Sequence, residues 1–285
     1  MVIVSLMGGL GNQLFQYAFG LRLASDWNTD LQLNQFLLSS RWLAKFRNYT
    51  PRSFELDVFG IEQPSVSPTP LIKAVLRADS MLLRESPDSA LSPIPITQPA
   101  NQVFCMGYWQ SERYFKDVDK VVRERMQFKK APSKETYKLV DKIQQTTQSV
   151  FLHVRRGDYI TNTDASQHHG FCGDEYYNRA ILHIRKQVAE AQFFIFSDDL
   201  PWVKRELGDK LKSAVYVEGN VGADSWQDMY LMTHCHHAII ANSSFSWWGA
   251  WLNPEQERVV IAPKQWLISQ KPDLTMTQPS AWQLL

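Results

Sequence analysis

The sequence predicts an α/β protein of two domains, of which the second has a parallel, doubly wound sheet. The chain has 285 residues, which at ~100 to 200 residues per domain favours two domains. Apolar residues make up 44% and charged residues 21%, as in ordinary globular proteins. From about residue 148 onward, short apolar runs alternate with segments of helical character, which is the pattern of strands joined by crossover helices.

The first domain is expected over residues 1–147. An apolar run from Val2 to Met7 predicts a strand, the glycines of "GGLGN" predict a turn, and apolar residues at near-helical spacing after it predict a helix. Proline and serine are frequent between Pro64 and Pro99, so loops are expected there, with one helix near Leu71–Leu83. A polar helix at Lys134–Ile143 and the polar "QQTTQ" then mark the end of the domain. Two further strands are expected, at Asp30–Asn34 and Gln102–Tyr108.

The second domain is expected over residues 148–285, where strands and helices alternate regularly. This alternation predicts a parallel sheet with helices on its faces. Ligands bind outside the carboxyl ends of the strands in such sheets, and three of the strands end in polar turns, so we expect these turns to face one crevice. The expected strands are 150–154, Gln192–Ser197, Ala214–Val217, His237–Ala241 and Arg258–Ile261, and the expected helices are Glu175–Val188, Pro201–Leu207, Asp224–Thr233 and Phe245–Leu252.

The first of these turns, "HVRRGDY", places two arginines at the end of an apolar strand. A guanidinium is a rigid fork of donors that suits phosphate oxygens and stays charged at any working pH. Because side chains alternate along a strand, Arg155 and Arg156 are expected to point to opposite sides, so that only one of them points into the crevice. The other would pair internally, and Asp158 is the nearest candidate for its partner. Surface ion pairing of both arginines is the alternative.

The last turn, "ANSSFSWWGAW", combines Asn242, Ser243, Ser244 and Ser246 with the start of an expected helix. Backbone N–H groups at a helix N-terminus bind phosphate well, and hydroxyl and amide groups add donors. The same residue types are equally suited to a simple N-cap, so both interpretations stay open. The three tryptophans of this segment are expected to pack the helix rather than to form a platform for a sugar.

The middle turn, in "FIFSDDL", presents Asp198 and Asp199 at a strand end. A carboxylate in this place could accept hydrogen bonds from a ribose or from the N1–H and N2–H₂ groups of guanine. One of the two aspartates is also expected to cap the helix that begins at Pro201. A ligand role is therefore expected for at least one of them.

The glycine turn after the first strand invites a dinucleotide interpretation, but the G-x-G-x-x-G fingerprint fails because Leu14 stands in place of the third glycine. Gly9 and Gly11 would still let the backbone approach a ligand closely, while Asn12 and Gln13 add hydrogen-bonding groups. A tight strand-to-helix turn without a ligand is the alternative.

Composition argues against several other classes of protein. With 30 basic and 29 acidic residues the net charge is +1, so no general field attracts nucleic acid, and any membrane contact is at most peripheral. Cys105, Cys172 and Cys235 lie far apart, which indicates neither a disulfide framework nor a C-x-x-C metal site. Asp117 and Asp119 form a D-x-D within a charged, helix-like stretch and are expected on a solvated face, so no metal is expected. No run of ~18 apolar residues predicts a membrane span, and a cytoplasmic location is expected.

Four motifs together resemble those of the α-1,2-fucosyltransferases, which move L-fucose from GDP-fucose to the 2-hydroxyl of a galactose. The motifs are "MGGLGNQLFQYAFG", "HVRRGDY", "FSDD" and "ANSSFSWWGAWL", in this order over most of the chain. The resemblance implies a GT-B fold, in which two Rossmann-like domains are separated by a cleft. It also implies an inverting reaction with GDP-fucose as the donor, a β-galactoside such as a lactose-type disaccharide as the acceptor, and no cofactor or metal.

The resemblance implies that residues of these motifs serve the donor or the reacting centre. Arg155 would hold the β-phosphate of GDP, and Asn12 would reach the phosphate or the reacting centre from the first domain. Further donor contacts are expected from His153 and Asp198 at the guanine, from Ser243, Ser244 and Phe245 at the pyrophosphate, and from Asn242, Gly9, Gly11 and Gln13.

The residues do not reveal which group takes the proton from the acceptor. Asp158 is one candidate, Glu55 and Asp57 in "RSFELDVF" are others, and a leaving phosphate oxygen is a fourth. Other functions also stay open. One is a glycosyltransferase of the same fold that uses another nucleotide sugar, and a second is a dinucleotide-dependent oxidoreductase that uses "GGLGN". A third is a nonenzymatic carbohydrate-binding protein, which would leave the arginine motif unexplained.

Overall fold

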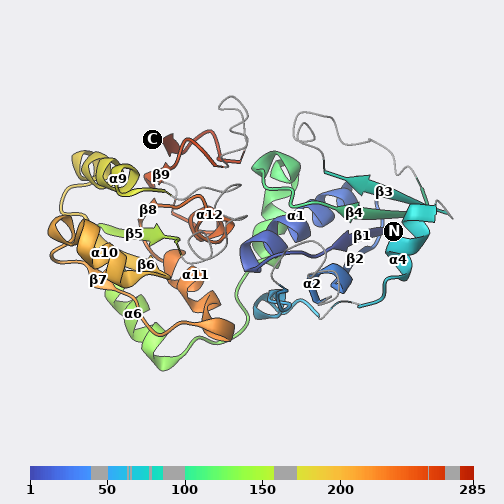
Figure 1. Cartoon of the computed structure of the whole chain (residues 1–285), viewed down its shortest axis with the longest axis horizontal. Helices are drawn as coiled ribbons and strands as arrows, with labels where there is room; N and C mark the ends of the chain where they lie inside the picture. The colour runs from blue at the N-terminus through green and yellow to red at the C-terminus, as the bar shows by residue number, and fades with distance from the viewer. Residues whose placement is uncertain are drawn as a thin grey trace. The chain divides into compact units, whose positions relative to one another are not determined.

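The computed structural model shows an α/β protein, as predicted, whose contacts divide the chain into two units, Met1–Lys130 and Ala131–Leu285. Each unit contains a parallel sheet with helices packed against it (Figure 1). The two units are described separately below. The structure describes residues 1–39, 51–62, 64, 66–76, 79–85, 100–156, 172–255, 257–266 and 277–285.

The first unit is built on a four-stranded parallel sheet with the strand order β2-β1-β4-β3. All three strands predicted for this part of the chain are present, as β1, β2 and β4. The strands are β1 (Val2–Ser5), β2 (Leu31–Asn34), β3 (Ser80–Arg84) and β4 (Gln102–Met106). The helices are α1 (Leu10–Asp26), α2 (Phe36–Ser39), α4 (Thr69–Leu76) and α5 (Asp119–Arg125), with short 3₁₀ helices at Leu56–Phe59, Glu112–Tyr114 and Lys116–Val118.

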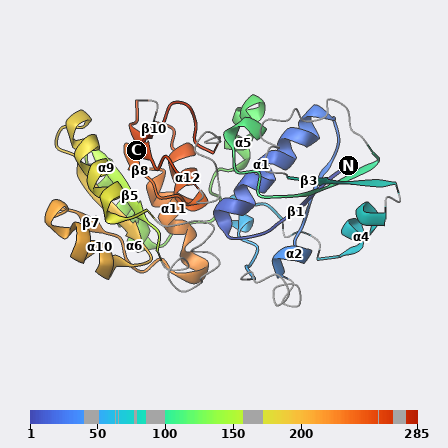
Figure 2. The same ribbon diagram turned by 45° about the horizontal axis from the view of Figure 1, so that its top comes forward.

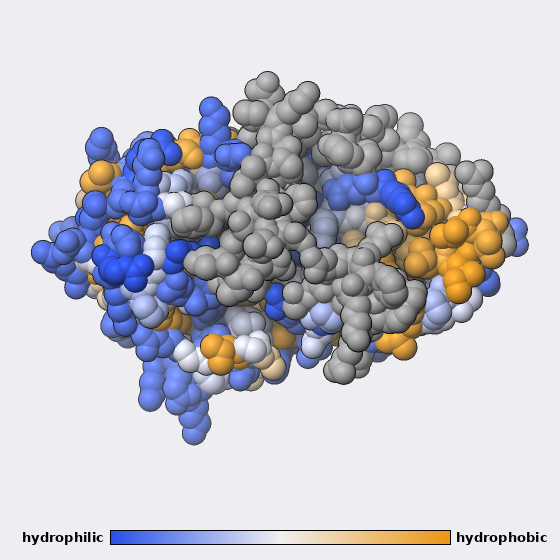
Figure 3. All heavy atoms as spheres, viewed as in Figure 1, coloured by the Kyte–Doolittle hydropathy of each residue, from blue (hydrophilic) through white to orange (hydrophobic). Residues whose placement is uncertain are grey.

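The predicted helix at Leu71–Leu83 is wrong in its second half. Helix α4 ends at Leu76, and Ser80–Arg84 instead forms β3. The reason is long-range pairing: β3 pairs with β4 over five residues, and Leu82 packs against buried Phe104, which outweighs the local helical pattern. The outer face of α4 is apolar in the view of Figure 3, where Ile72, Val75 and Leu76 are exposed.

Helix α1 lies very close to the sheet of the first unit because Gly20 faces it. A Cβ atom at this position would lie 2.7 Å from Cδ1 of Leu31 and 2.8 Å from Cγ2 of Val4, so only glycine fits without a shift. Phe19, the next residue of the helix, stacks on the ring of Trp109 with a centroid distance of 4.0 Å. This packing fixes the start of α1 beside the carboxyl ends of β1 and β4.

The second unit is built on a six-stranded parallel sheet with the strand order β10-β9-β8-β5-β6-β7. All five predicted strands and all four predicted helices are present, and the short strand β10 was not predicted. The strands are β5 (Ser149–Val154), β6 (Gln192–Ser197), β7 (Val215–Tyr216), β8 (His237–Ile239), β9 (Val260–Ala262) and β10 (Gln283–Leu284). The helices are α6 (Lys134–Gln144), α9 (Asp174–Gln187), α10 (Leu200–Leu207), α11 (Trp226–Met232) and α12 (Ser244–Trp251), with 3₁₀ helices at Gly208–Lys210 and Gly222–Asp224.

Helices cover both faces of the second sheet, as the doubly wound pattern predicts. Helices α9 and α10 pack on the face that carries Val150, Leu152 and Ile195. Figure 2 shows α11 and α12 on the other side of this sheet. Strand β5 is therefore buried along its whole length, which explains its continuous apolar run.

The three polar turns of the second unit follow adjacent strands. β5 lies between β8 and β6, and its register pairs Val154 with Ser197 and Leu152 with Ile239. Because all three strands are parallel, their carboxyl ends lie at one edge of the sheet. The prediction that these turns share one edge is thus confirmed.

Helix α6 belongs with the second unit, although the expected domain boundary lay after it, between residues 147 and 148. It packs against α11, and the backbone N–H of Ser133 donates to Oε1 of Gln227 at 2.7 Å. The division observed in the structure therefore falls between Lys130 and Ala131. In the described part of the chain, no helix combines the length and the apolar character needed to cross a membrane.

Candidate active site

His153 is the last but one residue of β5 and lies near the edge where the polar turns meet. It is 6% exposed, and its ring centroid is 6.0 Å from that of Phe245 at the start of α12. Burial, together with the positive charge of Arg155, lowers the pKa of His153 to about 3, so the ring is neutral. Its Nδ1 has no hydrogen-bond partner among the described residues. A buried ring nitrogen in this state is ready to bond a polar group of a ligand.

Arg155 is fixed by an ion pair with Asp198 from the next strand. The Nη1 atom of Arg155 lies 3.0 Å from Oδ2 of Asp198, and Oδ1 of Asp198 accepts the backbone N–H of Arg156 at 2.8 Å. Both oxygens of Asp198 therefore bind the arginine turn. Asp198 therefore orients Arg155, and its expected contact with guanine stays a prediction.

Arg156 pairs internally, as predicted, but its partner is Asp199. The Nη1 atom of Arg156 lies 2.5 Å from Oδ2 of Asp199, and its guanidinium carbon lies 4.3 Å from the ring centroid of Trp202. Oδ1 of Asp199 accepts the backbone N–H of Trp202 and so caps α10, which confirms that one of the two aspartates is a helix cap. The two arginines thus have different surroundings. Asp158, predicted to be catalytic and to pair with Arg156, lies outside the described residues.

The serine turn between β8 and α12 has both expected features, a cap and exposed polar groups. The hydroxyl of Ser243 accepts the backbone N–H of Phe245, which makes Ser243 the N-cap of α12. Ser243, Ser244 and Phe245 are all partly exposed. The following tryptophans are buried, which confirms that they pack the helix.

Asn242, for which a donor contact was expected, is 5% exposed and has protein partners. Its Oδ1 accepts from Sγ of Cys172, and its Nδ2 donates to the carbonyl of Trp266, both at 3.4 Å. This amide therefore joins the end of β8 to two other segments of the unit.

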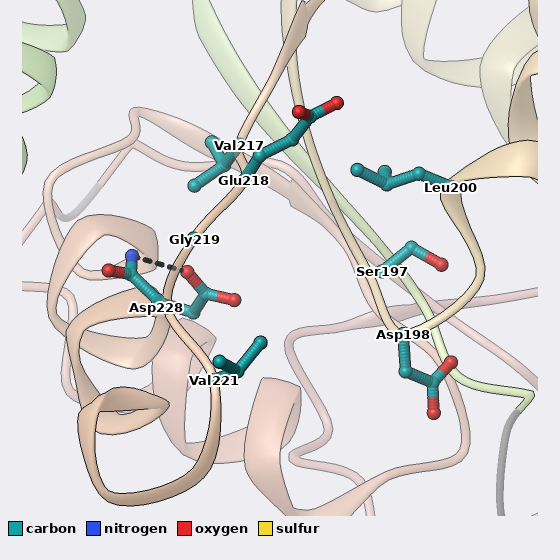
Figure 4. A pocket seen from close by; sticks show the side chains of 9 residues that line it. Ser197, Asp198, Leu200, Val217, Glu218, Gly219, Val221 and Asp228 are labelled. Atoms are coloured by element: carbon teal, nitrogen blue, oxygen red, sulfur yellow. Dashed lines mark hydrogen bonds between the residues drawn. The ribbon is translucent and has the colours of Figure 1, made fainter.

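A cavity of about 250 Å³ opens beside these turns, between the ends of β6 and β7 and helix α11. Figure 4 shows Asp198 and Asp228 on opposite sides of it. Burial raises the pKa of Asp228 to about 7, although a hydrogen bond from Nδ2 of Asn220 at 2.8 Å opposes the shift. The cavity is lined by Ser197, Asp198, Leu200, Val217, Glu218, Gly219, Asn220, Val221 and Asp228.

Asp228 was not predicted from the sequence. The only signal was one acidic residue in the otherwise uncharged helix "WQDMYLM". Perturbed carboxyl groups in cavities are frequent at functional sites, so Asp228 is a strong candidate for ligand contact.

The first unit carries a second polar turn, at the carboxyl end of β1. Gly8 has a φ of 76°, and a Cβ atom there would lie 2.3 Å from Nδ2 of Asn12, so the Asn12 side chain folds back over Gly8. Oδ1 of Asn12 accepts from Nε2 of Gln110 at 2.7 Å, and Gln110 follows β4. Two side-chain amides, one of them missed by the sequence prediction, therefore meet at this edge.

Gln13 is fully buried, and its side chain holds this turn in place. Its Nε2 donates to the carbonyls of Gly8 at 3.0 Å and Ser53 at 2.9 Å, and its Oε1 accepts the backbone N–H of Glu55 at 3.0 Å. Gly11 is also buried, in the first turn of α1. Gln13 thus positions the turn, while Gly9 is partly exposed.

Glu85, also missed, anchors the turn after β4. Its Oε2 accepts the backbone N–H groups of Tyr108 at 2.6 Å and Trp109 at 3.0 Å. Trp109 has a φ of 55°, an uncommon value for a bulky residue. The carboxylate therefore holds a strained backbone in place next to Gln110.

Comparison with known proteins identifies the family of this chain. The model for "Glycosyl transferase family 11" matches residues 84–280. The chain belongs to this family. The protein is therefore a family 11 glycosyltransferase, which confirms the resemblance seen in its motifs.

Its similarity to individual proteins covers very different shares of the chain. It is 32% identical to an α-1,2-colitosyltransferase of Escherichia coli over 296 residues, which cover 99% of this chain and 97% of the relative. It is 30% identical to human galactoside α-(1,2)-fucosyltransferase 1 over 104 residues, 36% of this chain and 28% of the relative. The solved structure of fucosyltransferase NodZ from Bradyrhizobium aligns with a TM-score of 0.50 at 14% identity, covering 89% of this chain and 92% of that one. This last likeness concerns the fold, which is of the GT-B type.

Proposed function

We propose that this glycosyltransferase moves L-fucose from GDP-fucose to the 2-hydroxyl of a terminal β-galactoside, with inversion at the anomeric carbon and without a metal ion. In this reaction the bond between fucose C1 and the β-phosphate oxygen breaks, and the electron pair leaves with GDP. The acceptor oxygen forms its bond to C1 from the opposite face of the sugar.

The observation that carries the proposal is the fixed guanidinium of Arg155. Charge that develops on the leaving GDP must be stabilised by preorganised donors. Asp198 holds Arg155 at the end of β5, and the N-terminus of α12 follows the neighbouring strand β8. A permanent cation and the free N–H groups of a helix N-terminus are together suited to a pyrophosphate.

The cavity beside Asp228 supports a guanine nucleotide. Guanine presents two adjacent donor groups, N1–H and N2–H₂, and one carboxylate can accept both. Adenine presents an acceptor, N1, where guanine has N1–H, and this acceptor would face the same carboxylate unfavourably. Asp228 and Glu218 line the cavity with acceptors, so it suits guanine better than adenine.

A second candidate donor is GDP-colitose, because the similarity to the colitosyltransferase extends over nearly the whole chain. Colitose is fucose without its 3-hydroxyl. A site built to bond that hydroxyl would strongly reject the sugar that lacks it, whereas a site with no group for it would accept both. Turnover of the two donors side by side therefore distinguishes the candidates.

The direct test is transfer by the purified protein to lactose, with GDP-fucose, GDP-colitose and a UDP-sugar compared in the presence and absence of a chelator. We expect an α-1,2-linked product from GDP-fucose that is unchanged by the chelator. If only GDP-colitose gives product, colitose and not fucose is the sugar that the protein transfers. No product from either GDP-sugar with any β-galactoside would refute the proposal, and loss of product with chelator would refute its metal-free part.

The role of Arg155 is tested by Arg155→Ala. Because loss of one preorganised charge-stabilising group typically costs ~10²- to 10³-fold in kcat, we expect a decrease of this size in kcat. Arg155→Lys is the matched variant, because it keeps a charge but not the fork of donors. Its kcat should lie between those of the wild-type protein and Arg155→Ala. Circular dichroism and the melting temperature control for folding. If Arg155→Ala keeps more than about a tenth of the wild-type kcat, Arg155 does not have this role.

A further inference from the structure

The cavity beside Asp228 has apolar side chains as well as carboxylates on its walls. Leu200 lies on one side, and Val217 and Val221 lie on the other, as Figure 4 shows. Ligand pockets are typically lined by apolar side chains, with a few polar groups that fix the orientation of the ligand. A planar base has two apolar faces and a polar edge, so the walls of this cavity match both parts of such a ligand.

The size of the cavity limits what it can hold. Its volume is about 250 Å³, which is below the ~300 to 1,000 Å³ of pockets that enclose a whole drug-sized ligand. A complete nucleotide sugar is a ligand of at least that size, so only a part of it can lie here. The base is the part that combines flat apolar faces with an edge of hydrogen-bonding groups.

Val221 is an apolar side chain that the folded protein leaves in water at this cavity. It is 77% exposed, the largest value among the large apolar side chains of the described residues, whereas Val217 on the same wall is 4% exposed. Figure 4 shows the side chain of Val221 directed into the space between the two walls. Single exposed apolar side chains are common on protein surfaces. Val221 differs from these because it borders a cavity, where a bound ligand would cover it.

The turn that carries Val221 has no other side chain directly around it. Gly219 has a φ of 97° and Gly222 a φ of 60°, both in the region that favours glycine, and a Cβ atom at either position would have no atom within 4 Å. Val221 itself is extended, its N–H donates to the carbonyl of Gly219 at 3.1 Å, and its carbonyl accepts the N–H of Asp224 at 3.1 Å. The turn thus presents one apolar side chain beside two residues that have none.

The same turn is joined to the carboxylate of the cavity. Asn220, which precedes Val221, donates from Nδ2 to Oδ1 of Asp228 at 2.8 Å. This hydrogen bond connects the turn to helix α11, which carries Asp228. A base whose edge bonds to Asp228 would therefore lie in the same small space as the side chain of Val221.

We propose that Val221 packs against the face of the purine base of the donor while Asp228 bonds the edge of that base. This inference rests on the proposed function. Contacts to the edge depend on the hydrogen-bonding groups of the base and so distinguish one base from another. Contact with the face depends on apolar area, which all purines share. Val221 therefore contributes affinity, and Asp228 contributes selectivity.

The test is calorimetric titration of Val221→Ala with GDP and with inosine diphosphate at pH 8. The base of inosine diphosphate keeps N1–H and the purine face but lacks the 2-amino group. We expect Kd to rise by ~5- to 15-fold for both nucleotides, because two methyl groups leave a buried apolar contact. The ratio of the two Kd values should stay as in the wild-type protein. In transfer assays the variant should raise KM for GDP-fucose and keep kcat, since the contact is the same in the ground state and the transition state.

Two further variants serve as controls. Val221→Ile keeps the apolar contact and should bind GDP at least as tightly as the wild-type protein. Val121→Ala makes the same substitution at another exposed valine, which lies on α5 in the first unit and is 41% exposed. Its Kd for GDP should equal that of the wild-type protein. The melting temperature controls for folding in all three variants.

Several outcomes would overturn the assignment of Val221. An unchanged Kd for GDP in Val221→Ala would show that the base does not cover this side chain. Weaker binding of GDP alone, with an unchanged Kd for inosine diphosphate, would mean that Val221 acts on the edge of the base. An equal loss in Val121→Ala would mean that the effect does not arise in the cavity. Failure of the proposed function is a separate result, in which the wild-type protein gives no product from either GDP-sugar whatever the Kd values are.

Discussion

Replacing Asp228 by asparagine tests the candidate nucleotide cavity through stability as well as through binding. Burial raises the pKa of this carboxyl from 3.8 to about 7 in the folded protein. A carboxyl with a raised pKa binds its proton more tightly in the folded than in the unfolded state. Its stabilising effect is therefore complete below about pH 4 and is lost as the pH rises through 7. Between about pH 4 and pH 7 the unfolded chain ionises this carboxyl while the folded protein keeps it protonated, and above pH 7 the folded protein holds a charge in a poorly hydrated site.

The size of this effect follows from the two pKa values. A difference between 3.8 and about 7, at ~1.4 kcal/mol per pH unit, corresponds to about 4 kcal/mol as an upper bound. Asparagine has nearly the same shape and cannot ionise. As the pH rises from 4 to 8, this titration lowers the free energy of unfolding of the wild-type protein by up to this amount. We expect this decrease to be absent in Asp228→Asn.

The assay is urea unfolding of both proteins at pH 4.5, 6 and 8, monitored by tryptophan fluorescence. The quantity of interest is the difference between the two pH dependences, because all other titrating groups are shared and cancel. Identical pH dependences in the two proteins would refute the reasoning, since they would mean that Asp228 is as well hydrated in the folded as in the unfolded state.

The same variant tests recognition of the nucleotide. If the ionised carboxylate accepts the two guanine donors, GDP binding lowers the pKa of Asp228 and releases a proton below pH 7. GDP affinity should then weaken about tenfold per pH unit below 7 in the wild-type protein, and should be low and independent of pH in Asp228→Asn. Calorimetric titration of GDP measures both. An unchanged Kd in the variant would remove Asp228 from the nucleotide site without affecting the stability result.

Two further predictions concern the turns themselves. Gly8→Ala should lower the free energy of unfolding by ~1 to 2 kcal/mol, because Gly8 has a φ of 76° and its Cβ would displace Asn12. In the matched control Gly9→Ala the new Cβ meets no atom closer than 3.9 Å, so a loss as large as that in Gly8→Ala would contradict this explanation. His153 has the opposite effect to Asp228, because folding lowers its pKa from 6.5 to about 3. Its contribution to stability is therefore fully present above pH 6.5 and is lost as the pH falls toward 3. In His153→Gln, the free energy of unfolding measured with urea should fall less between pH 6.5 and pH 3 than in the wild-type protein. The same fall in both proteins would show that the ring is hydrated in the folded state.

The sequence predicted the elements of the second unit well because they are local patterns. A strand buried on both faces, such as β5, is a mostly apolar run, and helices α10 and α12 begin at recognisable caps, Asp199 and Ser243. The exception in the first unit, β3, depends on pairing with β4, which is distant in the sequence. Parallel pairing of this kind leaves little trace in a single segment, so a helical interpretation of Leu71–Leu83 was the natural one.

The sequence predicted the residues of the candidate site by type, but it could not predict their partners within the protein. Asp198, Asn242 and Gln13 have the polar groups that a ligand requires, and in each case the structure shows these groups bonded to the protein. A polar side chain at a strand end can bind a ligand or hold a neighbour, and only its partners in three dimensions distinguish the two roles. Asp228 and Glu85 escaped prediction for the converse reason, since each owes its perturbed pKa to burial by segments far away in the sequence.

These supporting residues hold the two arginines that follow β5. Asp198 fixes the long side chain of Arg155, and in the proposed reaction a cation that is already in place needs no reorganisation as charge develops. The second arginine of the motif has a different role, because Arg156 joins the turn to α10 through Asp199 and Trp202. The two adjacent aspartates that follow β6 therefore pair one to one with the two adjacent arginines that follow β5. A substitution of Asp198 should affect kcat through the position of Arg155, whereas a substitution of Asp199 should act mainly on the stability of the unit.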